Sequence, residues 1–164
     1  MKKNLVLIAI LSLVIFACGP IATTETAVEY NDEMIDVQTD VDQALVDLLD
    51  EIDLGDEESI LDAQDEALKV IKDAEKKVDE MDDFDGKDDY KKAMKDLLKM
   101  YKDIVENELT EVIDYTIYYD DLTDDEWDYF YELYDSALEK YEEAFDEFTE
   151  FQKDFAEEWD FVLE

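Results

Sequence analysis

The sequence lacks histidine and arginine altogether, and its 164 residues include one cysteine, one proline and three glycines. Without histidine, neither a Ser-His-Asp triad nor a Cys-His pair can form, and the histidine-containing di-iron sites of helical bundles are excluded. Zinc sites of the usual histidine and cysteine type are excluded as well. Carboxylate pairs could still perform acid-base chemistry, but no pair stands out among 51 acidic residues. The sequence therefore predicts a protein that is not an enzyme and has no cofactor or metal site.

Positive charge is also scarce, since 14 lysines face 51 acidic residues and the formal net charge is −37. Binding to phosphate backbones needs a basic surface, so nucleic acid is excluded as a partner. Hydrophobic residues nevertheless make up 47% of the chain, which is too many for a disordered acidic tail. With so few glycines and prolines to interrupt the chain, long helices are favoured over sheets.

The one cysteine, Cys18, ends an N-terminal segment with the layout of a secretory signal peptide. Lys2 and Lys3 precede an apolar run over residues 5–16, and a small residue, Ala17, follows it. This run is shorter than the roughly 20 apolar residues that span a membrane. We therefore expect residues 1–17 to form a separate signal-peptide helix, and residues 18–26 to be a tether.

The residues Ile15-Phe16-Ala17-Cys18 resemble the lipobox of bacterial lipoproteins. The resemblance implies that the Cys18 thiol is acylated, that the peptide is cut before Cys18, and that the new N-terminus is acylated too. It makes the membrane a partner through acylated Cys18. Gly19 stands where Asp retains lipoproteins at the inner membrane in some bacteria, which favours the outer membrane, facing the periplasm or the cell surface. The alternative is that Cys18 belongs to an uncleaved hydrophobic anchor.

Four segments of the remaining chain repeat apolar residues at alternating spacings of three and four, which is typical of amphipathic helices. We expect helices over about 27–53, 57–82, 88–120 and 124–162. The third stripe contains one stutter. Short connections imply antiparallel neighbours, so residues 27–164 are predicted to form an all-α, up-down-up-down antiparallel four-helix bundle. Gln64 and Gln152 interrupt two stripes, and they either meet in the core or lie at its edge.

The predicted connections carry helix-capping and turn signals. Asp56 can cap the second helix, and the run from Thr123 to Glu126 is a capping box for the fourth. Gly86 lies in the polar run DDFDGKDD between the second and third helices. Aligned on Gly86, a calcium-binding EF-hand loop would need Asp at Met81 and Glu at Lys92, so this segment is predicted to be a plain turn.

Aromatic residues gather around the connection between the third and fourth helices. Because the third helix is longer than the second, we expect its last turns to project as a distal tip that is acidic and has no lysine. Tyrosine and tryptophan are enriched at interfaces, and an acidic aromatic tip suits a cationic or protein partner. Tyr118 and Tyr129 leave the apolar stripe and are expected to be exposed, whereas Tyr131 and Tyr134 follow it like core residues. The candidate partner-binding residues are Tyr115, Tyr118, Tyr119, Trp127 and Tyr129.

Most lysines lie between Lys69 and Lys102, and none lies in residues 19–68 or 103–139. One interpretation is that they neutralise the neighbouring acidic helices, because unrelieved repulsion costs stability. The alternative is that they meet anionic lipid head groups near the tether.

The stretches YNDEMIDVQ (30–38), MDDFDG (81–86) and YKDIVENE (101–108) resemble an uncharacterised family of small helical surface lipoproteins of Gram-negative bacteria. The resemblance implies a helical fold and an envelope location, and it brings no activity. The hypothesis is a lipid-anchored helical lipoprotein with a non-catalytic binding or structural function, whose partner docks at the distal tip. The alternative is a low-affinity binder of divalent cations or cationic peptides through acidic faces.

Overall fold

The computed structural model of the chain describes residues 22–54, 56–118 and 122–163. These residues are helical apart from short connections, and they contain no strand, only an isolated bridge between Phe84 and Lys87. The predicted all-α class is therefore confirmed. The predicted signal-peptide helix and the lipidation residue Cys18 lie outside the described residues.

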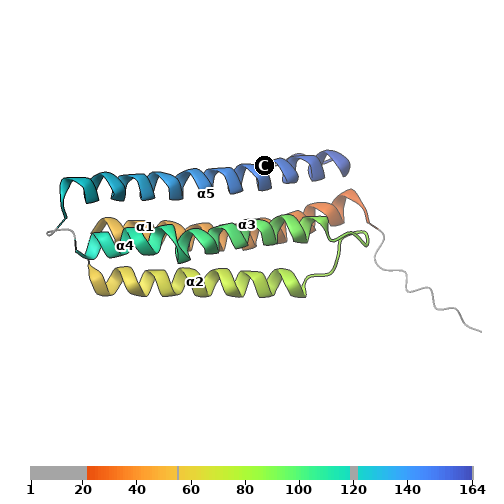
Figure 1. Ribbon diagram of the computed structural model, residues 1–164. Helices are drawn as coiled ribbons and strands as arrows, with labels where there is room; N and C mark the ends of the chain where they lie inside the picture. The colour runs from red at the N-terminus through yellow and green to blue at the C-terminus, as the bar shows by residue number, and fades with distance from the viewer. Residues whose placement is uncertain (1–21, 55, 119–121, 164) are drawn as a thin grey trace, which may run out of the picture.

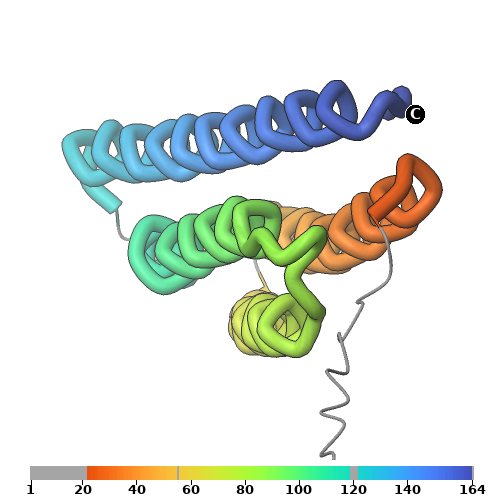
Figure 2. Tube along the Cα trace, turned by 90° about the vertical axis from the view of Figure 1, so that its right-hand side faces the viewer, coloured from red at the N-terminus to blue at the C-terminus, as the bar shows by residue number. Residues whose placement is uncertain are grey.

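The helices are α1 (Thr24–Leu54), α2 (Glu57–Glu80), α3 (Asp89–Glu106), α4 (Glu108–Ile117) and α5 (Asp124–Glu158). In Figure 1, α2 runs back along α1, α3 and α4 run back along α2, and α5 returns along them. Figure 2 shows α2 on one side of α1 and α3, and α5 on the other. We call the end where α1 begins and α5 ends the proximal end, and the opposite one the distal end.

The core is built from the apolar stripes of α1, α2 and α3, which face one another because each helix has a polar outer face. Burying a large aliphatic side chain stabilises a fold by about 1.5–3 kcal/mol, so these stripes supply most of the stability. α5 packs mainly on α3 and α4 and only lightly on α1. The largest fully buried side chains include Met34, Leu48, Ile60, Ile71, Met94, Leu98 and Tyr101.

The segment 88–120, expected to be one helix, contains two helices that meet at Asn107. The break coincides with the stutter between Val105 and Leu109. The Asn107 side chain donates to the Asp103 carbonyl at 3.0 Å, and Thr110 Oγ1 donates to the Val105 carbonyl at 2.9 Å. Gln64 Nε2 donates to Thr110 Oγ1 at 2.8 Å, so a polar side chain of α2 helps to satisfy the break. Gln64 therefore has its partner here rather than at Gln152, which is buried on α5 close to Tyr90.

Two predicted helix starts are confirmed. Asp56 Oδ1 accepts from the Ser59 backbone N–H at 3.0 Å at the start of α2. At the start of α5, Thr123 and Glu126 form a capping box, in which the Thr123 N–H donates to Glu126 Oε2 at 2.8 Å. Each cap satisfies an N–H group that the helix leaves unpaired, and each contributes about 1 kcal/mol.

The connection between α2 and α3 is a tight turn at the proximal end. Asp85 and Gly86 both adopt positive φ, 51° and 72°. The turn brings the Lys87 N–H to the Phe84 carbonyl at 2.9 Å and directs Phe84 against the core. Lys91 Nζ donates to the Met81 carbonyl at 2.5 Å, which stabilises the C-terminal end of α2.

Candidate binding site at the distal end

A groove of about 620 Å³ opens at the distal end, where the last turn of α1, the end of α4 and the first turns of α5 meet. The groove lies between α1 and α5, which pack only lightly on each other. Leu54 on α1 is 73% exposed and Tyr131 on α5 is 58% exposed. The lining residues are Ile52, Asp53, Leu54, Tyr115, Thr116, Trp127, Phe130, Tyr131 and Tyr134.

Four aromatic rings of α5 form one wall of the groove. They lie at positions i, i+3, i+4 and i+7, which places them on one helix face. Trp127 contacts Phe130 and Tyr131 with centroid distances of 5.5 and 5.9 Å, and Phe130 stacks on Tyr134 at 6.4 Å. Because each ring touches the next, the wall is a continuous aromatic surface rather than four separate side chains.

The surroundings of the groove are acidic. Asp53 lines the groove from α1. Burial raises the pKa of Tyr134, and the negative charge of Asp53 adds to this shift. Asp124, Asp125 and Glu126 occupy the first turn of α5, where the helix dipole favours negative charge. The chain has no lysine from residue 103 to residue 139. The nearest lysine in sequence, Lys140, is ion-paired with Glu108. The distal end therefore combines an aromatic wall with uncompensated negative charge.

A second aromatic contact lies beside the groove. The rings of Tyr115 and Tyr129 meet edge to face at 5.9 Å, and the Tyr129 hydroxyl donates to Glu111 Oε2 at 3.1 Å. The hydrogen bond to this carboxylate raises the pKa of Tyr129. Tyr115 also lines the groove, so it connects the two aromatic groups.

The structure brings together some of the residues predicted from the sequence. Tyr115 and Trp127 line the groove. Tyr129 touches Tyr115 and is 42% exposed, and Tyr118, at the end of α4, is 66% exposed, as expected for both. Tyr119 lies outside the described residues. The expected projection of the third helix is not seen, because α4 ends at Ile117, close to the level of the first turn of α2 in Figure 1.

Sequence reasoning missed most of the groove. Phe130, Tyr131 and Tyr134 follow the apolar stripe of α5 and therefore resemble core residues, yet Tyr131 is largely exposed. Ile52, Asp53 and Leu54 belong to another helix, and nothing in their local sequence indicates that α5 diverges from them. The available signal was the density of aromatic residues between Trp127 and Tyr134, which exceeds what one buried stripe requires.

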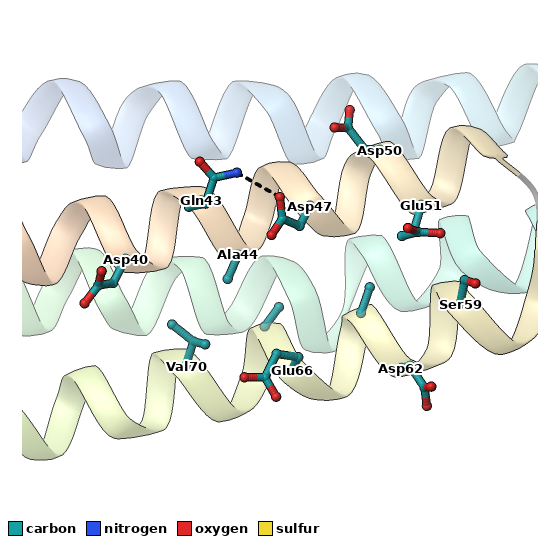
Figure 3. A pocket seen from close by; sticks show the side chains of 12 residues that line it. Asp40, Gln43, Ala44, Asp47, Asp50, Glu51, Ser59, Asp62, Glu66 and Val70 are labelled. Carbon is teal, nitrogen blue, oxygen red and sulfur yellow. Dashed lines mark hydrogen bonds between the residues drawn. The ribbon is translucent and has the colours of Figure 1, made fainter.

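A second groove, of about 670 Å³, runs between α1 and α2 (Figure 3). Its floor is made of small side chains, and its walls are carboxylates that Figure 3 shows spread along both helices. Gln43 Nε2 donates to Asp47 Oδ1 at 2.8 Å, and Lys69 pairs with Glu66 at 2.8 Å. Among the residues that the structure describes, no three acidic side chains converge into a potential metal site. The wall carboxylates are Asp40, Asp47, Asp50, Glu51, Asp62 and Glu66.

A polar cluster joins α1, α3 and α5 near mid-bundle. The Tyr141 hydroxyl donates to Asp42 Oδ1 at 3.2 Å, and the rings of Tyr141 and the buried Tyr101 stack at 5.0 Å. Burial raises the pKa of Asp42, although the hydrogen bond from Tyr141 opposes the shift. Burial, followed by the charge of Asp42, also raises the pKa of Tyr101. The evident effect of the cluster is to connect α1 with α5.

The lysines of α2 and α3 pair largely with acidic residues of the same region. Lys95 pairs with Asp79 across the two helices, and Lys91 lies 3.5 Å from Asp83. Lys87 reaches Glu158 at the end of α5 at 2.8 Å. These contacts favour the interpretation that the lysines relieve repulsion between acidic helices.

None of the helices in the described part of the chain is both long and apolar enough to cross a membrane. Neither a family model nor a curated protein nor a solved structure matches this chain.

Proposed function

We propose that this protein is a lipid-anchored helical lipoprotein of the cell envelope with a non-catalytic binding function. In this proposal residues 1–17 form a signal-peptide helix that is removed, and Cys18 is acylated and holds the protein at the membrane. The rest of the chain is an up-down-up-down antiparallel four-helix bundle whose distal end binds a partner. The outer membrane is the favoured location, with the bundle facing the periplasm or the cell surface.

The observation that carries the proposal is the position of the aromatic groove relative to the start of α1. α1 begins at Thr24, six positions after Cys18, and its 31 residues end beside the groove. At 1.5 Å per residue, α1 separates its own start from the groove by about 45 Å. A bundle anchored at Cys18 would present the groove away from the bilayer, where a partner can reach it.

Anchoring is tested with the full chain expressed in a Gram-negative host that is fed labelled palmitate. We expect label on the membrane-associated protein, an N-terminus at Cys18, and loss of both in Cys18→Ser. Stable anchoring needs more than one acyl chain. The Cys18→Ser variant, which carries none, should therefore be lost from the mature protein in the membrane fraction. If Cys18→Ser instead remains in the membrane and has the mass of the unmodified protein apart from the substitution, the N-terminal segment is an uncleaved hydrophobic anchor.

The acidic groove between α1 and α2 favours a second candidate function, low-affinity binding of divalent cations or cationic peptides. Its carboxylates lie along an open channel, which suits diffuse binding rather than a closed ion site. Thermal unfolding across a calcium titration, with sodium chloride at matched ionic strength, tests it. A saturable rise in the midpoint beyond the sodium series supports cation sites, and coinciding series contradict them.

A further inference from the structure

We infer that the distal groove binds a basic peptide segment of a partner protein and that an arginine side chain of this segment enters the groove. The inference rests on the proposed function, because it names the partner class for the same end of the bundle. It adds the surface that makes the contact. On α5 this surface contains Phe130 and Tyr131, and on α1 it contains Asp53 and Leu54.

The groove has the size and lining of a ligand site. Pockets of about 300–1,000 Å³ with mainly apolar walls and a few polar groups are typical of binding sites. The volume of about 620 Å³ leaves room for more than one side chain. Phe130 meets Tyr131 edge to face at 5.4 Å, and Trp127 packs on both rings. Rings that are already held by one another lose little conformational freedom when a partner binds.

Charge decides among the occupants that could cover this apolar surface. A second copy of the chain would bring the same acidic residues, Asp53 and the acids that open α5, against one another. The tether precedes α1 in the sequence, and α1 begins at the opposite end of the molecule (Figure 1). Anionic lipid and nucleic acid are repelled for the same reason as a second copy. A cationic partner is the one whose charge complements the site.

Within the cationic class, arginine fits the wall better than lysine does. A guanidinium group is planar and weakly hydrated, so it stacks on tyrosine and tryptophan faces and can pair with a carboxylate through two hydrogen bonds. The groove offers both elements, with the rings of Trp127 and Tyr131 on α5 and the Asp53 carboxylate on α1. The aliphatic stem of the same side chain can cover exposed Leu54.

The test measures binding of a fluorescein-labelled peptide, Gly-Arg-Leu-Arg-Gly, to the full chain in a non-ionic detergent by fluorescence anisotropy. Two further peptides replace arginine by lysine or by the neutral isostere citrulline. Tyr131→Ala removes a largely exposed groove ring and should weaken arginine-peptide binding about tenfold. Asp53→Asn should weaken it about fivefold. The lysine peptide should bind a few-fold more weakly than the arginine peptide, and the citrulline peptide at the detection limit.

Matched controls separate this inference from the proposed function. Tyr118→Ala removes an exposed distal tyrosine outside the groove, and Asp36→Asn removes one exposed charge of α1; each should change the affinity less than twofold. If Tyr118→Ala and Tyr129→Ala weaken binding while Tyr131→Ala does not, the groove is the wrong surface, although docking at the distal end stands. If all these variants bind alike, or the citrulline peptide binds as well as the arginine peptide, both the groove and distal docking to a cationic partner are contradicted.

Discussion

The two ends of the bundle are both rich in aromatic residues, but they use them differently. At the proximal end most ring contacts join separate elements: Phe84 of the turn lies 5.2 Å from Tyr30 of α1 and 5.0 Å from Trp159 after α5. Tyr90 of α3 packs on Phe155 of α5 at 4.8 Å. At the distal end most ring contacts join neighbours within α5. An aromatic stripe therefore becomes core only where another element supplies the rings that face it.

The same contrast extends to polar partners. Tyr90 is 3% exposed, and its hydroxyl donates to the buried Asn31 Oδ1 at 2.7 Å. At the proximal turn Lys87 forms an ion pair with Glu158, and Lys91 donates a hydrogen bond to the Met81 carbonyl. The distal tyrosine with a comparable bond, Tyr129, bonds a surface carboxylate and stays exposed. The proximal end is therefore the more tightly packed of the two, and the distal end leaves aromatic surface exposed.

The largest expected effect comes from removing the ring that closes the proximal end. Phe84→Ala should lower the free energy of unfolding by about 3 kcal/mol, because Phe84 joins α1 and α5 through the turn. Phe130→Ala, at the distal end, should cost about half as much, since the rings that Phe130 touches, Trp127, Tyr131 and Tyr134, all belong to α5 itself. Urea denaturation of both variants measures the difference. Equal losses would contradict the distinction between the ends.

A smaller effect is expected when one hydroxyl is removed at each end. Tyr90→Phe should destabilise the protein by about 2 kcal/mol, because it leaves the buried Asn31 oxygen without its donor. Tyr129→Phe should cost less than about 0.5 kcal/mol, since the Glu111 carboxylate can bond to water instead. The readout is again the free energy of unfolding. A Tyr129→Phe loss as large as that of Tyr90→Phe would show that the distal bond is structural.

The proximal turn itself gives the third prediction. Gly86 has φ of 72°, and a Cβ added there would meet nothing within 4 Å. Gly86→Ala should therefore cost about 1 kcal/mol through backbone strain alone. Asp85→Gly, at the neighbouring position with φ of 51°, should leave stability nearly unchanged, because the relieved strain is offset by the greater freedom that glycine has in the unfolded chain. Thermal unfolding compares the two, and a loss of several kcal/mol in Gly86→Ala would mean that the turn is sterically crowded.

Local features of the fold could be predicted from the sequence, because neighbouring residues determine them. The cap at Asp56 and the capping box of Thr123 and Glu126 depend on side chains within three positions of each other. The stutter between Val105 and Leu109 marked the break, but spacing alone does not say whether a helix absorbs an extra residue or ends. The helix ends at Asn107, where hydrogen bonds from the Asn107 side chain to the Asp103 carbonyl and from Gln64 of α2 to Thr110 stabilise the break.

The groove could not be predicted in the same way, because it depends on how far α5 lies from α1. Trp127, Phe130 and Tyr134 keep helical spacing whether or not another helix covers them. The exposure of Leu54 and Tyr131 follows from tertiary packing. The sequence did predict that this end is acidic and aromatic, because its composition does not depend on the angle at which the helices pack.

The smallest predicted effect concerns the polar cluster between the two ends. Burial raises the pKa of Asp42 above its ordinary 3.8, so the folded state favours the protonated form. Any stability that this preference provides is complete below the unfolded-state pKa and is lost as the pH rises through the folded pKa. Asp42→Asn stays neutral and can still accept from Tyr141. Its stability relative to the unmodified protein should therefore rise with pH above about 4 and then level off.

The size of this change should stay below about 1 kcal/mol, because water reaches part of the Asp42 carboxylate and screens it. Asp36→Asn, on the exposed face of α1, is the matched control: it also removes one negative charge but leaves the cluster with Tyr101 and Tyr141 intact. Urea denaturation at pH 3, 5 and 7 gives the two pH profiles. If they coincide, the gain comes from lower net charge. If only Asp42→Asn gains stability as the pH rises, the partly buried charge of Asp42 weakens the contact between α1 and α5 at neutral pH. The distal groove opens between the same two helices.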